Sequence, residues 1–414
     1  MSEEMKNLNE QPEETVVENT EPQVEETPVE EPKVEHVEPK VEAKKPLDKK
    51  TIGIIAGVAA AVVALVIILV IALGGQKPAA LNDYTLGMGV AFGDFDGTQF
   101  NATVATVVLD KDGKIVACRL DAVQNKYSAD FNEDTFKFTV LETKMELGTR
   151  YGMGQETLDA TNSWMDTNGD GKVLEWNEQA KAFESYVVGM TVEQVEALET
   201  KVAGTHNIST DDALLSAGCT IDITGFKAAI VKACKDEFKV SFQSAGTFTL
   251  GLAANSADNG SKVELFEAYI KMNVDLAASV VEDGKIVANI NDAMQPEIKF
   301  DDIEVLEKSV GKGADILMTK RELKEGYGMG QESITDANKW MDNNNDSKVL
   351  EWYLQSAEFS KFVVGKTADE VKNLETKAAG THNISNDDAL LSAGCTIDIV
   401  GIKAVVAESV TNAR

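Results

Sequence analysis

Oxygen-bearing side chains recur at alternate positions in two short segments that lie 176 positions apart. The first segment contains Asp166, Asn168 and Asp170, with Glu175 and Glu178 close behind, and the second contains Asp342, Asn344 and Asp346, with Glu351 behind. Carboxylate and amide oxygens in this pattern suit a hard cation such as Ca²⁺. A solvated turn between two helices, in which Asp, Asn and Gly are ordinary residues, would have a similar composition.

Each segment resembles an EF-hand loop, and the resemblance implies a helix on either side and Ca²⁺ between them. The two segments also depart from that family. The place of the bidentate Glu that closes the EF-hand shell is taken by Asn177 in one segment and Tyr353 in the other, and Ser347 replaces a glycine. Glu175 and Glu351 stand two positions too early. We therefore expect a weak site in which Glu175 or the nearby Glu178 completes the shell, with a structural role rather than a sensor role.

A second set of short motifs surrounds the first. In chain order these motifs are DGKIV, then ETK followed by EL, then AGCT followed by an isoleucine and a helix. In order and rough spacing they resemble the FMN-binding domain family, in which an ETPG-like and an SGATxT-like segment hold the phosphate and ribityl chain of the flavin. The matching positions are Glu142, Thr143, Gly148, Gly218, Cys219 and Thr220 in the first half of the chain, and Thr319, Leu323, Gly394, Cys395 and Thr396 in the second half.

One departure from the flavin family bears on chemistry. Family members that attach flavin covalently use the last Thr of SGATxT, and that position is Asp222 in the first half and Asp398 in the second. A carboxylate cannot form the phosphoester and repels phosphate, which argues against covalent FMN. The resemblance then implies noncovalent FMN, with the backbone N–H groups of Gly218–Thr220 cradling an anion. The alternative is a scaffold whose pocket has been repurposed or lost.

Other residues with chemical potential have simpler explanations. One histidine per half, His206 and His382, is expected to pack or cap rather than bind metal. Cys219 and Cys395 are expected to be buried small hydrophobic residues. The four tryptophans, at positions 164, 176, 340 and 352, are expected to pack a pair of helices. A Cys118–Cys234 disulfide is an option that the sequence leaves open.

The repeated motifs indicate a duplicated domain. The segments Asp211–Ile223 and Asp387–Ile399 are identical, and every match in this part of the chain shares the offset of 176. A repeat of this length is a domain rather than a solenoid unit. We place copy one at 83–237 and copy two at 239–414.

Each copy is expected to belong to the α+β class, with an antiparallel sheet packed by helices. An Asp-Gly pair between β-rich runs predicts a hairpin in each copy. Helices are predicted in copy one at 142–147, 155–165, 175–187, 192–200 and 226–233, with another short turn of helix beginning near Asp212. The CTIDI segment at 219–223 is predicted to be a strand.

The N-terminal part differs in composition from both copies. The first 50 residues hold six of the eight prolines and 15 acidic residues, which predicts disorder. Residues 51–73 carry no charge, and 23 such residues are long enough to span a bilayer as one helix. Four lysines at positions 44–50 precede this span and only Lys77 closely follows it, so the tail is expected in the cytoplasm and both copies outside.

The overall charge limits the partners of the chain. A net charge of −30 disfavours nucleic acid and anionic lipid surfaces. The sequence shows no nucleophile–base pairing, P-loop or GxSxG motif. The leading hypothesis is a single-pass, extracellular, non-enzymatic module of a bacterial surface that binds a small ligand or noncovalent flavin for electron transfer. The alternative hypothesis is a structural or adhesive module stiffened by Ca²⁺.

Overall fold

The computed structural model describes residues 80–93, 98–130, 132–166, 169–263, 268–300, 317–342 and 347–414. The predicted tail and the predicted membrane span therefore lie outside the described residues. Within the described ranges, no helix combines the length and the apolar character needed to cross a membrane. Residues 78–414 form one compact unit by their contacts, and the description below concerns this unit.

Copy one contributes four strands to an antiparallel sheet of five. The strands are β1 (Asn82–Phe92), β2 (Gln99–Asp110), β3 (Ile115–Asp130) and β4 (Thr135–Val140), and the order is β4-β3-β2-β1-β7. The fifth strand, β7 (Val240–Ser244), follows the predicted boundary between the copies and pairs with β1, with Phe242 opposite Tyr84. A segment assigned to copy two thus completes the sheet of copy one.

Copy two builds its own antiparallel sheet around one long strand, β10 (Ala268–Glu282). The strands β8 (Thr249–Asp258) and β9 (Lys262–Val263) pair along one edge of β10, and β11 (Lys285–Met294) and β12 (Glu297–Phe300) pair along the other. The two predicted Asp-Gly hairpins are confirmed as β2–β3 and β10–β11. In the second hairpin Asp283 and Gly284 both have positive φ, as a tight two-residue turn requires.

The helical parts of the two copies correspond element by element. The helices of copy one are α2 (Lys144–Leu147), α3 (Trp176–Tyr186), α4 (Val192–Glu196), α5 (Asp212–Ser216) and α6 (Thr224–Lys235). Those of copy two are α8 (Lys320–Leu323), α9 (Trp352–Phe362), α10 (Ala368–Lys372), α11 (Asp388–Ser392) and α12 (Val400–Thr411). Each copy also has a small hairpin that the sequence analysis missed, β5–β6 (Thr200–Ala203, His206–Ser209) and β13–β14 (Thr376–Ala379, His382–Ser385).

Short 3₁₀ turns connect α2 to α3 and α8 to α9. They are η1 (Gly148–Tyr151), η2 (Met153–Gln155) and η3 (Ser163–Met165) in copy one, and η4 (Lys324–Tyr327), η5 (Met329–Gln331) and η6 (Lys339–Met341) in copy two. The predicted helix at 155–165 is therefore wrong. Side chains capture its backbone instead, because the N–H of Asp159 donates to Asn162 Oδ1 and the N–H of Thr161 donates to Asp159 Oδ1.

The predicted strand at 219–223 is also wrong. Its polar groups form isolated hydrogen bonds rather than a ladder with a neighbouring strand. The Thr220 N–H donates to Gln179, and the Asp222 carboxylate accepts the N–H groups of Asn207 and Thr224. The segment is an extended connection that ends where α6 begins.

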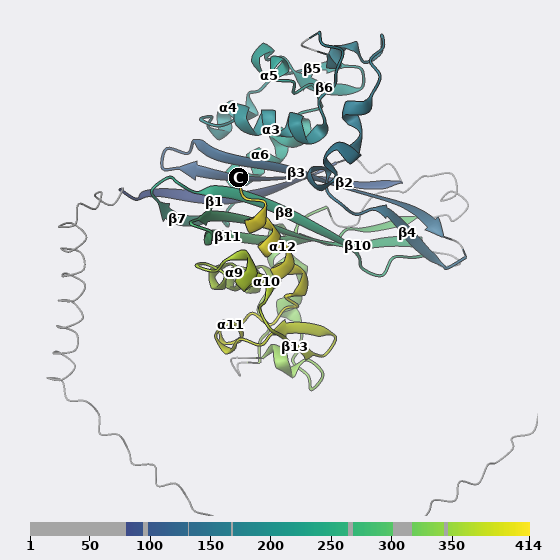
Figure 1. The fold of residues 1–414 in the computed structure, drawn as a ribbon. Helices are drawn as coiled ribbons and strands as arrows, with labels where there is room; N and C mark the ends of the chain where they lie inside the picture. The colour runs from purple at the N-terminus through teal and green to yellow at the C-terminus, as the bar shows by residue number, and fades with distance from the viewer. Residues whose placement is uncertain are drawn as a thin grey trace, which may run out of the picture. The chain divides into compact units, whose positions relative to one another are not determined.

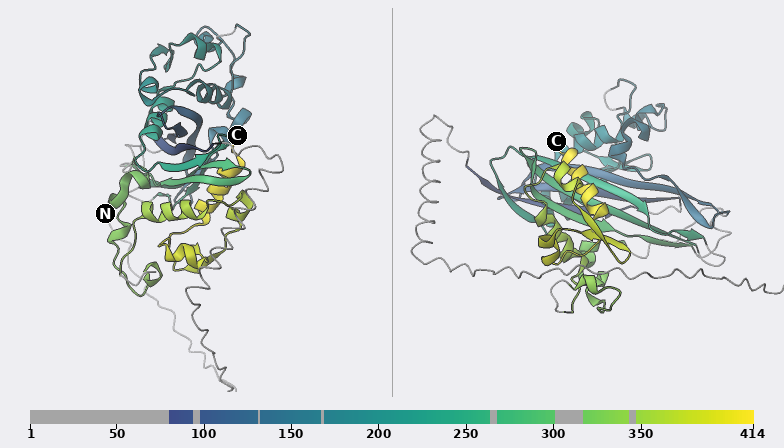
Figure 2. Two further views of the ribbon diagram at one scale, coloured as in Figure 1. Left: turned by 90° about the vertical axis from the view of Figure 1, so that its left-hand side faces the viewer. Right: turned by 60° about the horizontal axis from the view of Figure 1, so that its bottom comes forward.

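The unit has four layers, helices–sheet–sheet–helices, which Figure 1 shows with the helices of copy one above and those of copy two below. The two sheets face each other across one hydrophobic core to which both copies contribute. Phe136 of copy one stacks on Phe300 of copy two, with ring centroids 5.6 Å apart. The outer face of each sheet carries a second core under its own helices. Further views in Figure 2 show the same stacking of the two sheets. The predicted α+β class with antiparallel sheets is confirmed.

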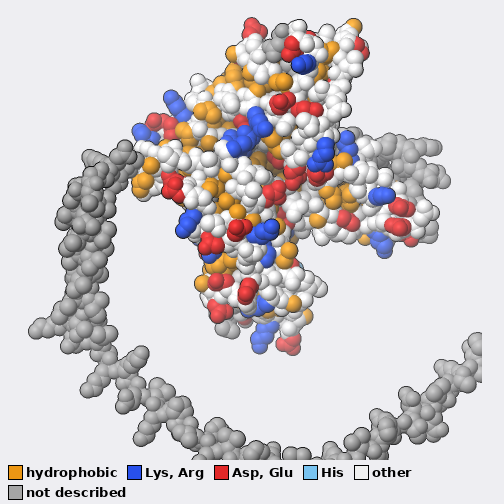
Figure 3. All heavy atoms as spheres, in the orientation of Figure 1, with side chains coloured by type: hydrophobic (Ala, Val, Ile, Leu, Met, Phe, Trp, Pro, Cys, Tyr) orange, Lys and Arg blue, Asp and Glu red, His pale blue; other side chains and the backbone are white. Residues whose placement is uncertain are grey.

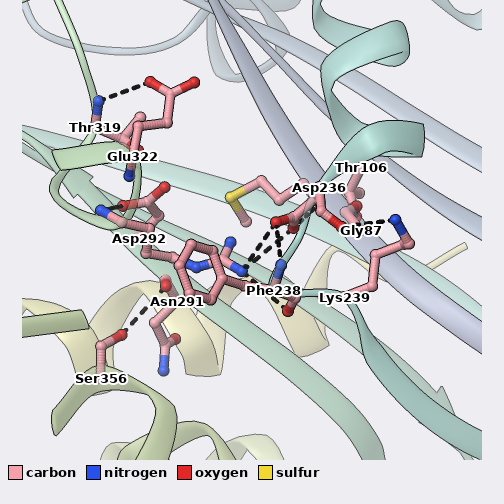
Figure 4. Close-up of polar contacts among 12 residues, drawn as sticks. Gly87, Thr106, Asp236, Phe238, Lys239, Asn291, Asp292, Thr319, Glu322 and Ser356 are labelled. Carbon is pink, nitrogen blue, oxygen red and sulfur yellow. Dashed lines mark hydrogen bonds and ion pairs between the residues drawn. The ribbon is translucent and has the colours of Figure 1, made fainter. Parts of the chain in front are cut away.

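Polar contacts also join the copies. Arg321 of α8 donates to the Asp236 carboxylate at 3.2 Å and to the Phe238 carbonyl at 3.1 Å, and both side chains of the ion pair are buried. Figure 4 draws the residues around this contact. Nearby, Lys232 pairs with Glu322 at 2.8 Å. Acidic and basic side chains are interspersed on the face shown in Figure 3.

Candidate ligand site in copy two

The predicted anion cradle at Gly218–Thr220 has no donors left to offer. The N–H of Gly218 donates to the Leu215 carbonyl, that of Cys219 to the Leu214 carbonyl, and that of Thr220 to Gln179 Oε1. In copy two Gly394, Cys395 and Thr396 donate in the same way to Leu391, Leu390 and Gln355. Because every one of these N–H groups is used inside the protein, these segments do not fit a flavin phosphate.

The predicted flavin threonines act as helix caps. Thr143 accepts the N–H of Glu146 through Oγ1, and the Glu146 carboxylate accepts the Thr143 N–H, so the pair forms a capping box at α2. Thr319 does the same with Glu322 at α8. Both threonines are buried. Beside them Glu142 is exposed and pairs with Arg150, and Leu323 is the last residue of α8.

Gly148 is explained by its backbone rather than by a ligand. It ends α2 with φ 51° and ψ −124°, and Lys324 ends α8 with the same two angles. This region is open to glycine and costs an L residue about 1–3 kcal/mol. Copy two therefore carries strain at Lys324 that copy one avoids.

Replacing Lys324 by glycine should stabilise the protein. We expect Lys324→Gly to raise the free energy of unfolding by about 1 kcal/mol, because relief of the backbone strain outweighs the loss of the solvent-exposed pair with Glu237. Gly148→Lys should lower it by a similar amount. Chemical denaturation followed by circular dichroism measures both changes, and a destabilised Lys324→Gly variant would contradict the strain argument.

The predicted cation loops are only partly described, because Asn168, Asn344 and Asp346 lie outside the described residues. Asp166 accepts the N–H groups of Asp170 and Gly171 at 3.0 and 2.9 Å, and Asp342 accepts the N–H of Ser347 at 3.2 Å. The helix expected before each loop is absent, so the arrangement is not helix–loop–helix. No group of three or more acidic, histidine or cysteine side chains in the described ranges is placed to hold a metal ion.

One property of Glu175 and Glu351 nevertheless favours a cation site. Both are buried, and the Oε2 atom of each has no hydrogen-bond partner within the described part of the chain. In copy one Glu175 lines a cavity of about 370 Å³ together with Asp170, Glu178 and Gly218. The structure thus brings together three of the candidate metal ligands, Asp170, Glu175 and Glu178, and one predicted flavin residue, Gly218.

The four cysteines are free and buried, so the disulfide between Cys118 and Cys234 is not formed. Burial raises the pKa of Cys219 and Cys395 to about 12, which fits the expected apolar role. Trp176 and Trp352 are core residues as expected. The other two tryptophans are half-buried and lie against the histidines, with ring centroids 5.7 Å apart for Trp164–His206 and 5.5 Å apart for Trp340–His382.

A cavity of about 410 Å³ opens in copy two between the outer face of its sheet and the loops around α8 and α9. Its aromatic and histidine lining comprises Tyr327, Trp340, Trp352 and His382, and its polar lining includes Asn273, Asp275, Gln295, Lys320, Thr396 and Asp398. The volume and the mixture of aromatic walls with a few convergent polar groups are those of a small-molecule site. Thr396 is the one predicted flavin residue that lines it.

Lys320 is the central cation of this cavity. Its ammonium lies 4.8 Å from the centre of the Tyr327 ring and 5.0 Å from that of Trp352. Burial lowers the pKa of Lys320 to about 8, although the carboxylates of Asp275 and Asp292 act in the opposite direction. Lys144 lies in the same way over Tyr151 and Trp176 in copy one, and its pKa is also lowered to about 8 by burial.

A chain of polar side chains crosses the sheet side of the cavity. The Tyr327 hydroxyl donates to Gln295 Oε1, and Gln295 Nε2 donates to Asn273 Oδ1, each at 3.0 Å. Asn273 in turn bonds to Asp275, whose pKa is raised by burial and also by the charge of Asp398. The indole Nε1 of Trp340 is buried beside Gly380 and has no hydrogen-bond partner among the described residues.

Copy one differs from copy two at the positions that match Asp275 and Trp340. Thr103 occupies the place of Asp275, because each lies against the glycine that begins the last helix of its copy, Gly225 or Gly401. The indole Nε1 of Trp164 donates to the Thr161 carbonyl, whereas that of Trp340 is unused. Copy two therefore has a carboxylate at its cavity that copy one lacks, and an indole donor that its own backbone does not use.

Exchanging these residues should move the lysine pKa values in opposite directions. In Asp275→Thr the pKa of Lys320 should fall below about 8, because a carboxylate that favours the charged amine is removed. In Thr103→Asp the pKa of Lys144 should rise above about 8. NMR titration of the lysine side-chain resonances measures both values. An unchanged Lys320 pKa in Asp275→Thr would show that Asp275 is not its electrostatic partner.

Sequence reasoning missed Asp275, Lys320 and the Tyr327–Gln295–Asn273 chain. One signal was present, because Asp275 is a charged residue inside an otherwise apolar run, VDLAASVV. Lys320 follows the helix-capping residue Thr319, and nothing in the sequence around it gave a comparable signal.

Comparison of the chain with protein-family models, with curated proteins and with solved structures gives no match. The resemblance to FMN-binding domains therefore remains a prediction, and the site has to be judged from its own geometry.

Proposed function

We propose that this chain is a membrane-anchored, extracellular, non-enzymatic ligand-binding module whose site is the Lys320 cavity of copy two. The observation that carries the proposal is the convergence of a buried lysine, a buried carboxylate and the Tyr327–Gln295–Asn273 chain on one cavity with aromatic walls.

The cavity favours a planar, uncharged heteroaromatic ring. Aromatic side chains provide surfaces for stacking, and Lys320 and Gln295 provide hydrogen-bonding groups for ring heteroatoms. Asp275 and Asp398 disfavour a phosphate, and the N–H groups of Gly394–Thr396 are already used. Among flavins this chemistry favours riboflavin over FMN. A bound flavin ring would give the module a role in electron transfer.

The test is a titration of the full-length chain in lipid nanodiscs with riboflavin and with FMN, followed by flavin fluorescence and visible absorption. The proposal predicts saturable binding of riboflavin that is at least about tenfold tighter than that of FMN, which corresponds to about 1.4 kcal/mol. Tighter binding of FMN would overturn the exclusion of phosphate. If neither flavin binds, flavins are excluded as the ligand class.

A second candidate function is a surface module stiffened by Ca²⁺, and the unpartnered oxygens of Glu175 and Glu351 favour it. With a dissociation constant near 10⁻⁴–10⁻³ M, 10 mM Ca²⁺ should stabilise the protein by about 1.5–3 kcal/mol, and a chelator should reverse the effect. Thermal unfolding of Glu175→Gln should show a smaller response to Ca²⁺, whereas the exposed control Glu156→Gln should respond like the wild type. An equal melting temperature with Ca²⁺ and with chelator would contradict this function.

A further inference from the structure

A second cavity of copy two lies between α9 and strand β11, under the segment that joins the copies, and it is independent of the Lys320 cavity. Its volume is about 290 Å³. Its apolar walls include Phe238, Tyr353, Leu354 and Val364. Phe238 and Tyr353 lie against each other with ring centroids 5.4 Å apart, while Leu354 and Val364 are 40% and 47% exposed at the mouth.

Two buried asparagines of β11 line the same cavity. Asn289 and Asn291 are 1% and 2% exposed, and the Oδ1 atom of each has no hydrogen-bond partner in the described ranges. The amide of Asn289 is oriented by its Nδ2, which donates to the Ala278 carbonyl at 3.0 Å, so its oxygen is the free group. Figure 4 shows Asn291 beside Ser356 and Phe238. A buried acceptor without a donor costs about 1–3 kcal/mol, which an occupant with an N–H or O–H group could recover.

The cations around the cavity are already paired. Arg321 is held by Asp236, Lys361 pairs with Glu358 at 2.6 Å, and Lys239 donates to the carbonyls of Cys234 and Asp236. These cations therefore give the cavity no strong preference for an anion. The lining favours an uncharged occupant.

The equivalent seam of copy one holds a cavity of about 310 Å³ whose lining is charged and includes Arg119, Lys181 and Arg414. Glu184 of α3 is buried there, accepts the N–H of Leu120, and pairs with Arg119 and Arg414. In copy two the matching residue is Ser360. The neighbouring helix positions have also changed from Glu178 and Lys181 to Leu354 and Ala357. These replacements remove charged residues and make the mouth of the copy-two cavity apolar.

We propose that this cavity binds a small uncharged aromatic molecule that carries one N–H or O–H donor. The ring occupies the space between Phe238, Tyr353 and Leu354. The donor points toward the oxygens of Asn289 and Asn291. Indole has these features and is the probe of choice, and 1-methylindole has the same ring without the donor.

The experiment titrates the full-length chain in lipid nanodiscs with 5-fluoroindole and follows the fluorine NMR signal. The double variant Leu354→Glu/Ala357→Lys installs the residues of copy one and should weaken binding at least tenfold. The control Val202→Glu also places a charge on an exposed apolar residue, at 76% exposure, but lies in the distant β5 and should bind like the wild type. 5-Fluoro-1-methylindole should bind at least tenfold more weakly than the parent compound.

The following results would overturn part or all of the proposal. No saturable signal from the wild type, or equal binding by the double variant, would show that the cavity is not the site. Equal binding of the methylated probe would overturn the role of the two asparagines. Circular dichroism checks that the double variant is folded. We expect it to fold because both new residues occur at the matching positions of α3.

Discussion

Replacing Arg321 by methionine is expected to destabilise the protein by about 3 kcal/mol. The side chains of Arg321 and Asp236 are 9% and 7% exposed, and removal of one partner leaves the other charge buried and unpaired. The matching positions at the offset of 176 carry Met145 in copy one and Asn412 in copy two, which form no ion pair. The chain therefore fills the equivalent pair of positions with two uncharged side chains.

The double variant Arg321→Met/Asp236→Asn should recover most of this loss. It installs the residues found at the matching positions of the other copy, and the asparagine oxygen can still accept one of the two N–H groups, of Met88 or of Phe238, that the two Asp236 oxygens accept. A double-mutant cycle by chemical denaturation measures the coupling, which we expect to exceed about 1 kcal/mol. Additive effects of the two single replacements would show that the pair does not hold the copies together.

Replacing Gly251 by alanine is expected to cost about 3 kcal/mol. A Cβ at Gly251 would lie 1.7 Å from the Ser409 carbonyl oxygen, which belongs to the backbone of α12 and cannot move alone. The helix would have to lift from β8, and overpacking of this kind costs about 1–3 kcal/mol or more. The matched control is Gly326→Ala, because nothing lies within 4 Å of a Cβ there and its φ is not positive.

Thermal unfolding of these two alanine variants distinguishes close packing from a general effect of losing glycine. The control should change the melting temperature little. A Gly251→Ala variant as stable as the control would mean that α12 does not approach β8 as closely as described. Gly87 meets the Ala233 carbonyl of α6 in the same manner in copy one, so Gly87→Ala should repeat the result.

Features that depend on neighbouring residues could be predicted from the sequence. The Asp-Gly hairpins form because their turn residues adopt the required positive φ, Gly113 in the first hairpin and both Asp283 and Gly284 in the second. The cap at Thr191 and the exit helix of each loop follow from local spacing in the same way, whereas Thr143, which the resemblance marked as a flavin contact, is a helix cap. The predicted helix at 155–165 failed because Asp159 and Asn162 bond to the nearby backbone, a competition that helical periodicity does not register.

The candidate site depends on contacts that the sequence does not reveal. Asp275 lies on β10 and Lys320 on α8, and only the packing of the helices on the sheet brings them to one cavity. The glycines read as flavin contacts serve the backbone instead, as the shared angles of Gly148 and Lys324 show. The shared core between the two sheets was equally hidden, because each copy alone reads as a complete α+β domain.

The most direct test of the ligand site compares Trp340→Ala with its copy-one counterpart Trp164→Ala in the riboflavin titration. Trp340 lines the cavity and has the unused indole donor, whereas Trp164 donates to its own backbone. The account predicts that Trp340→Ala weakens riboflavin binding at least about tenfold and that Trp164→Ala leaves it within about twofold. Equal effects of the two replacements, or a larger effect of Trp164→Ala, would contradict a site in copy two.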